Sequence, residues 1–137
     1  MSFYTWTDDL TVGNPALDDQ HKLLIDLINR YHDILEQNGA RSALLASFRA
    51  IAEFAIRHFR DEEAQMARCA YPQIERHKMI HKQLLDRVGT LGQQLAAGEA
   101  GIENQIQFFL KNWLTAHIKG IDQQYTPYMS GKARAVA

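Results

Sequence analysis

Apolar residues recur every three or four positions in four long stretches of the chain, a spacing that places them on one face of an α-helix. The first stretch predicts a helix over about residues 17–37, which stops at Gly39. The second predicts a helix from Arg41 or Ser42 that ends before the Tyr71-Pro72 pair, because proline disfavours helical backbone in the residue before it.

The other two stretches have the same period. Pro72 suits a first helical turn, so a third helix is expected from there to Gly98. A fourth is expected from about Ile102 to around Gly120, and Pro127 rules out much further helix. Nothing alternates at period two for long, so strands are not expected.

The remaining segments are the two ends. Residues 1–15 contain Gly13 and Pro15 with little periodicity and predict an extended arm, whereas residues 130–137 resemble a frayed tail. Four amphipathic helices of similar length joined by short connections predict an all-α fold, an antiparallel up-down-up-down four-helix bundle. With 137 residues, the chain is expected to form a single domain, 1–137.

Composition narrows the class of protein. A net charge of −1 provides no basic field for nucleic acid or anionic lipid. No stretch is long and apolar enough to insert into a membrane, and the N-terminus does not resemble a secretory signal. With Cys69 as the single cysteine, no intrachain disulfide can form, which fits a reducing compartment. A cytoplasmic location is therefore expected.

Histidines and carboxylates lie on the apolar stripes of all four predicted helices, where an unpaired polar group costs a few kcal/mol. His-x3-His or His-x3-Glu spacing places both side chains on one helix face. A bound metal would take up their lone pairs, whereas ordinary hydrogen-bonded histidines would explain any one of them alone. The seven candidate metal ligands are His21, His58, Glu62, His77, His81, His117 and Asp122.

The number and type of these candidates indicate which metal. A structural zinc ion takes four ligands, so seven are too many for one zinc. Mixed imidazole and carboxylate ligands suit iron, and two irons would use all seven. The Glu-x-x-His pairs of ferritin-like di-iron proteins are absent from the sequence, which disfavours that carboxylate-rich class.

Longer motifs make the sequence similar to the hemerythrin family, and to its bacterial single-domain members in particular. The likeness covers nearly the whole chain. The motifs are Trp6, Val12-Gly13, Asp18-Asp19-Gln20-His21-Lys22, His58-Phe59-Arg60-Asp61-Glu62-Glu63 with Met66, Tyr71-Pro72, His77-Lys78-Met79-Ile80-His81, Trp113-Leu114, His117-Ile118-Lys119-Gly120-Ile121-Asp122 and Tyr125.

The resemblance implies a role for each candidate ligand. One iron would be held by His77, His81 and His117, and the other by His21 and His58. Glu62 and Asp122 would bridge two iron ions (Fe2+/Fe3+), together with an oxo or hydroxo group. The iron with one histidine fewer would keep an open position for dioxygen. Candidate residues lining an oxygen pocket, each explained equally well by core packing, are Leu24, Ile25, Ala55, Trp113 and Leu114.

Three further residues have simpler expected roles. Glu63 should point about 140° away from His58, toward solvent or a salt bridge. His32 lies about 16 Å along the helix from His21 and should make a hydrogen bond near the bundle end. Cys69 should be a small core residue.

The spacing between His117 and Asp122 conflicts with a regular helix, which would place residues five apart on different faces. Gly120 lies between them and tolerates unusual backbone angles. We therefore expect a π-type turn or a loosened helix end there.

The leading functional hypothesis is a non-enzymatic oxygen carrier, store or supplier, with dioxygen as ligand and a monomer as the expected state. An oxygen or redox sensor acting through a separate, unidentified protein partner is an alternative. A di-iron oxidase or peroxide-handling enzyme is another, although the sequence places no acid or base beyond the ligands near the open iron. Iron storage is disfavoured, because a histidine-rich site should hold a fixed pair of ions.

Overall fold

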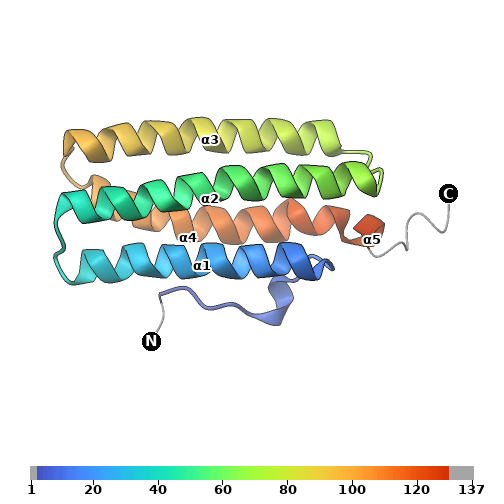
Figure 1. The fold of residues 1–137 in the computed structure, drawn as a ribbon, viewed down its shortest axis with the longest axis horizontal. Coiled ribbons are helices and arrows are strands. Elements are labelled where there is room, and N and C mark those ends of the chain that lie inside the picture. The colour runs from blue at the N-terminus through green and yellow to red at the C-terminus, as the bar shows by residue number, and fades with distance from the viewer. Residues whose placement is uncertain (1–2, 130–137) are drawn as a thin grey trace.

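The computed structural model describes residues 3–129, and the predicted tail lies outside that range. Its four long helices are α1 (Pro15–Glu36), α2 (Arg41–Arg68), α3 (Ile74–Ala97) and α4 (Ile102–Gly120). They run in alternating directions, and contacts join both α1 and α3 to α2 and α4 (Figure 1). No strand occurs within the described residues. The predicted all-α, antiparallel four-helix bundle is therefore confirmed.

The first helix begins two residues earlier than predicted. The Asn14 side chain accepts hydrogen bonds from the backbone N–H groups of Ala16 and Leu17, and Pro15 occupies the first helical position. Before this cap, the N-terminal arm runs alongside α1 and includes one short 3-10 helix, η1 (Asp8–Leu10) (Figure 1).

The bounds of α3 and α4 agree with those predicted from glycine and proline, except at the start of α3. α3 begins at Ile74 rather than Pro72, and it ends at Ala97, where the next residue, Gly98, has a φ of +71° and forms a left-handed cap. α4 has the predicted bounds. The chain then forms a 3-10 helix, η2 (Asp122–Tyr125), and the four-residue helix α5 (Thr126–Met129), in which Pro127 lies in the first turn.

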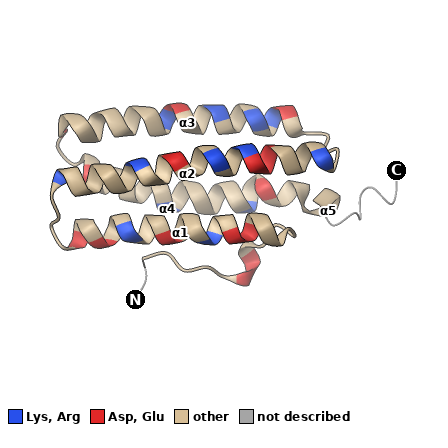
Figure 2. Ribbon diagram, in the orientation of Figure 1, with Lys and Arg blue, Asp and Glu red and all other residues tan. Residues whose placement is uncertain are grey.

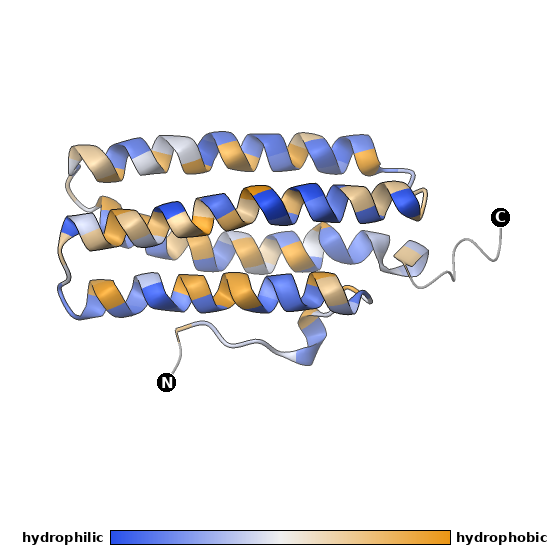
Figure 3. Ribbon diagram, in the orientation of Figure 1, coloured by the Kyte–Doolittle hydropathy of each residue, from blue (hydrophilic) through white to orange (hydrophobic). Residues whose placement is uncertain are grey.

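Two kinds of core fill the bundle. Near the α1–α2 connection the fully buried side chains are large and apolar, including Tyr31, Phe48, Leu91, Leu95 and Ile106. Apolar bands recur along each helix, but α2 becomes hydrophilic in its C-terminal half (Figure 3). The opposite half of the bundle therefore encloses polar side chains.

The outer surface mixes both signs of charge on every long helix (Figure 2). This distribution agrees with the small net charge of −1. Within residues 3–129, no helix has the length and hydropathy needed to cross a membrane.

Candidate metal centre

All seven predicted ligand side chains lie inside the bundle, with at most 5% of any residue's surface exposed. α1 contributes His21, α4 contributes His117, and α2 and α3 each contribute a pair of residues four apart. A separation of four residues keeps each pair on the inward face of its helix. The structure therefore brings together every residue that the spacing had singled out.

Asp122 reaches this interior because α4 ends before it. The last backbone bond of α4 runs from the Ile121 N–H to the His117 carbonyl, and the tighter η2 then begins at Asp122. This is the loosened helix end that was expected, not a π-type turn. The suggested reason was wrong, since Gly120 is helical and does not have a positive φ.

The two oxygens of Glu62 face different histidines. Oε1 lies 3.2 Å from Nε2 of His77 and 2.9 Å from Nε2 of His81. Oε2 lies 3.8 Å from Nε2 of His21 and 3.7 Å from Nε2 of His58. One carboxylate thus presents an oxygen to each side of the cluster.

Asp122 has the same arrangement, from the segment that follows α4. Its Oδ1 lies 3.1 Å from Nε2 of His77 and 3.0 Å from Nε2 of His117. Its Oδ2 lies 3.2 Å from Nε2 of His21. Both carboxylates are therefore placed to bridge two neighbouring cations.

Despite these short distances, many of the facing atoms have no hydrogen-bond partner among the described residues. They are Nε2 of His21, His77, His81 and His117, Oε1 of Glu62, and both carboxylate oxygens of Asp122. Unpaired buried polar atoms are rare because each costs about 1–3 kcal/mol. Here they converge on shared points instead of aiming at one another, which is the arrangement that a metal ion requires.

The electrostatics also favour cations. Burial acts to raise the pKa of Glu62, but the imidazoles of His77 and His81 outweigh it and lower that pKa to about 2. The pKa of Asp122 is likewise held well below its usual value against the effect of burial, chiefly by His117. Both carboxylates therefore stay ionised at neutral pH.

The histidines differ from one another. Burial lowers the pKa of His58 to about 4, so its ring is neutral with a free lone pair. Burial also acts to lower the pKa of His77, but the Asp122 and Glu62 carboxylates outweigh it and raise that pKa to about 9. A proton on His77 would be displaced when a metal binds, because only the neutral ring is a ligand.

The candidate ligands divide into two unequal sets in space. Each set has one ligand atom per residue, and all its ligand atoms lie within 4.8 Å of one another. The three-histidine set consists of Glu62, His77, His81, His117 and Asp122, and the two-histidine set consists of His21, His58 and Glu62. The site thus fits two metal ions that share a carboxylate but differ in their number of imidazoles.

Comparison with known proteins agrees with this geometry. Residues 12–129 match the family described as hemerythrin HHE cation binding domain. The chain belongs to the hemerythrin family. It is 32% identical to a bacteriohemerythrin of Methylococcus capsulatus, over 95% of this chain and 99% of that protein. A myohemerythrin of Riftia pachyptila is 30% identical over 89% of this chain and 90% of its own length.

Solved hemerythrin structures resemble the fold closely. A crystal structure of wild-type hemerythrin superposes with a TM-score of 0.85 at 31% identity and covers 94% of this chain and 99% of that one. A mutant hemerythrin gives 0.86 at 30% identity, over 95% and 99% of the two chains. The four-helix bundle of this protein is therefore the hemerythrin fold.

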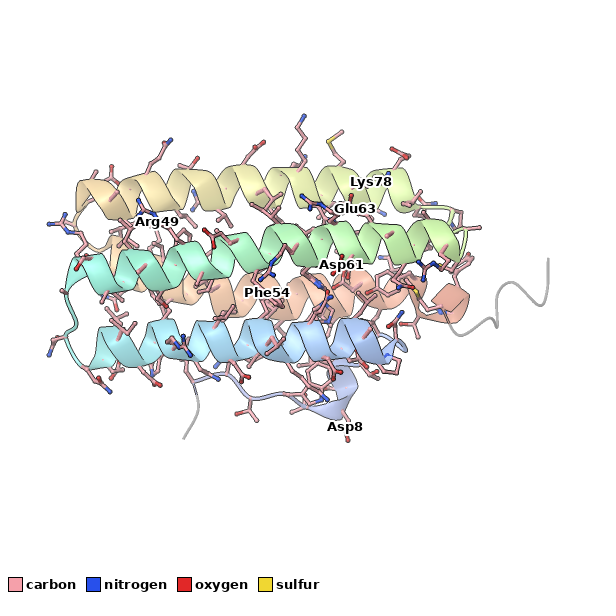
Figure 4. The ribbon with its side chains drawn as sticks, viewed as in Figure 1. Asp8, Arg49, Phe54, Asp61, Glu63 and Lys78 are labelled. Atoms are coloured by element: carbon pink, nitrogen blue, oxygen red, sulfur yellow. The ribbon has the colours of Figure 1, made fainter. Side chains whose placement is uncertain are left out.

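Beyond the ligands, this protein has an outer layer of hydrogen bonds, of which the sequence had indicated only a salt bridge of Glu63 as one alternative, without its partner. Nδ1 of His58 lies 2.7 Å from Oε1 of Gln20, whose Nε2 donates to the Asp61 carboxylate at 2.9 Å. Nδ1 of His81 lies 2.8 Å from the Glu63 carboxylate. In Figure 4, Asp61 and Glu63 lie in the C-terminal part of α2, with Glu63 between α2 and α3. Such partners fix the orientation of a ligating imidazole.

Tyr125 contacts the centre from η2. Its hydroxyl donates a hydrogen bond to Oε2 of Glu62 at 2.8 Å, and the residue is fully buried. Burial and then the charge of Glu62 raise the pKa of Tyr125 well above its usual value, so it stays a neutral donor. The resemblance had included Tyr125 without assigning it a contact.

The residues expected to line an oxygen pocket are placed as follows. Leu24, Ile25, Ala55 and Leu114 are buried, and Trp113 is partly buried against Phe59 and His117. Their role as a lining stays a prediction. Of the residues set aside, His32 makes the expected hydrogen bond, with Gln107.

Proposed function

We propose that this protein holds two iron ions (Fe2+/Fe3+), joined by an oxo or hydroxo bridge, and binds dioxygen reversibly. His77, His81 and His117 would hold one iron, His21 and His58 the other, and Glu62 and Asp122 would bridge them. The observation that supports this assignment is the division of each carboxylate's oxygens between the two sides of the cluster. Imidazole and carboxylate ligands without thiolate suit iron.

The unequal ligand sets support dioxygen as the ligand. The two-histidine set provides one imidazole fewer, which leaves room for a small molecule on that side. Such a pair of irons, when bound, supplies the electrons on which dioxygen binding depends. Leu24, Ile25 and Ala55 are buried on the same helices as His21 and His58, and they would exclude water from this side.

We further propose that the protein is not an enzyme and that it acts as an oxygen carrier, store or supplier. Its relatives are named hemerythrins, bacteriohemerythrins and myohemerythrins, and none of these names denotes a catalytic activity. A cytoplasmic location, a monomeric state and a single domain stay predictions.

An optical spectrum tests the proposal directly. The protein is reduced without air, its iron is quantified, and spectra are taken before air, with air and after evacuation. Two irons per chain and a visible charge-transfer band that appears with air and disappears under vacuum are the expected results. An irreversible change on exposure to air would contradict reversible binding and favour an oxidase.

Two histidine variants sharpen this test. His58→Ala removes a ligand of the two-histidine set and should abolish the band. His32→Ala is the matched control, because His32 bonds Gln107 and is not part of either ligand set. It should retain both irons and the band.

A further inference from the structure

The segment that supplies Asp122 has two faces with different partners. In a 3-10 helix, residues three apart lie directly above one another. Asp122 and Tyr125 therefore share the buried face, where one joins the ligand sets and the other donates to Glu62. Gln123 and Thr126 share the neighbouring face, which points toward the N-terminal arm.

That second face is bonded to the arm at several points. Nε2 of Gln123 donates to the backbone carbonyls of Asp9 at 2.6 Å and Thr11 at 3.2 Å. Oγ1 of Thr126 donates to the carbonyl of Val12 at 2.8 Å. The arm also approaches closely, since a Cβ added to Gly13 would lie 2.9 Å from Cγ2 of Thr126.

The arm is in turn fixed to the helix that supplies His21. The Asp18 carboxylate accepts hydrogen bonds from the Val12 N–H at 2.9 Å and the Thr11 hydroxyl at 2.5 Å. Asp18 lies one turn before His21 in α1. A continuous path of hydrogen bonds thus joins α1 to η2 through the arm.

This external support matters because η2 is weakly held by its own bonds. Its first residue follows Ile121, which provides no side-chain cap. The element has four residues, and 3-10 hydrogen bonds have poorer geometry than those of an α-helix. The other six candidate ligands project from long α-helices and do not depend on such support.

We propose that Gln123 is a positioning residue, which ties η2 to the N-terminal arm and thereby holds the Asp122 carboxylate between the two metal positions. The inference rests on the proposed metal centre. Without the two bonds from Gln123, η2 would leave the bundle more often, and each departure would remove a bridging carboxylate and admit water. Bound metal would then be lost faster.

The test compares two neighbouring glutamines. Gln123→Met keeps the size of the side chain and removes its hydrogen bonds to the arm. Gln124→Met is the matched control, because Gln124 is exposed and its side chain bonds the Gly120 carbonyl and the Tyr71 hydroxyl, not the arm. Full-length wild type and both variants are loaded with Co2+, and transfer of the metal to an excess of chelator is followed in the visible spectrum.

We expect Gln123→Met to lose Co2+ about ten-fold faster than wild type, the lower end of the usual effect of outer partners of a metal site. Gln124→Met should stay within about two-fold of wild type, since it leaves the arm bonds intact. In the metal-free proteins, hydrogen exchange of the amides of residues 121–126 should accelerate in Gln123→Met alone, while the α2 amides keep their protection. A merely general loss of stability would accelerate both regions.

Equal rates of metal loss in the two variants, or equal exchange at 121–126, would overturn the positioning role. This result would leave reversible oxygen binding untouched. Conversely, if iron-loaded wild type shows no reversible band but Gln123→Met still loses Co2+ faster, the oxygen proposal fails and the positioning role stands. A wild type that takes up no metal would overturn both.

Discussion

Among the side chains around the centre, Glu63 is an acidic residue that contacts a candidate ligand. Its carboxylate contacts Nδ1 of His81, so it can fix the orientation of the ring as a ligand. Glu63→Ala should lower metal affinity by on the order of 10–100-fold, the usual range for such partners. Competition with a chelator of known affinity measures this change.

A matched acid provides the control for Glu63. Glu75→Ala removes an exposed carboxylate whose ion pair within the described part of the chain is with Lys78, at 3.9 Å, and it should leave metal affinity unchanged. Equal affinities in the two variants would show that the contact with His81 has no part in metal binding.

For Tyr125, we expect a substitution to change folding stability. Tyr125→Phe leaves a buried, ionised Glu62 without its neutral donor, and a hydrogen bond to a charged group contributes about 1.5–3 kcal/mol. The metal-free variant should therefore unfold at lower urea concentration. Tyr128→Phe is the control, because Tyr128 packs against Tyr71 and the described residues show no hydrogen bond from its hydroxyl. A midpoint for Tyr125→Phe as high as that of Tyr128→Phe would contradict the argument.

These contacts mark how far sequence reasoning could go. Ligand candidates such as His77 and His81 stand out because both their spacing and their cost in an apolar core are visible in the sequence. For Glu63, a salt bridge was foreseen as one alternative, but not its partner, because His81 lies on another helix. The role of Gln20 could not be predicted, since nothing in the sequence distinguishes a glutamine that faces solvent from one that bonds a ligand such as His58.

Among the elements, α3 shows that a glycine can stabilise a helix at its end and weaken it in its interior. Gly98 ends α3 with φ +71°, which costs a residue with a side chain about 1–2 kcal/mol. Gly89 lies inside α3, and a Cβ there would meet nothing within 4 Å. Gly98→Ala should therefore lower the free energy of unfolding, whereas Gly89→Ala should raise it by about 0.5–1 kcal/mol. Urea denaturation measures both, and changes of the same sign would refute the assigned backbone roles.

The element that was hardest to predict from the local sequence is η2, which follows α4. The four long helices follow from periodicity with glycine and proline at their ends, and they were predicted to within a few residues. The five-residue spacing from His117 to Asp122 indicated an irregularity there. It could not indicate η2 itself, because η2 is held partly by bonds to the arm, more than 100 residues earlier in the chain.

In the molecule as a whole, an apolar half and a metal-binding half share the same four helices. The apolar half, with Tyr31, Phe48 and Leu95 fully buried, needs no metal to exclude water. The other half encloses buried histidines and carboxylates, and many of their facing atoms lack a hydrogen-bond partner among residues 3–129. Bound metal should therefore stabilise the metal-binding half more than the apolar half, although both belong to one bundle.

Removal of the metal tests this division. We expect the metal-free protein to remain helical but to melt at lower temperature, because a ligand that binds only the folded state stabilises it by mass action, by about 2.7 kcal/mol at a hundred-fold excess over its Kd. Hydrogen exchange should accelerate most in η2 and in the turns around His58, His77 and His117, where the cost of unpaired buried groups is concentrated. The α1–α2 connection end should retain nearly all its protection. Equal acceleration in both halves would mean that the bundle opens as one unit and that the metal supports the apolar core as well.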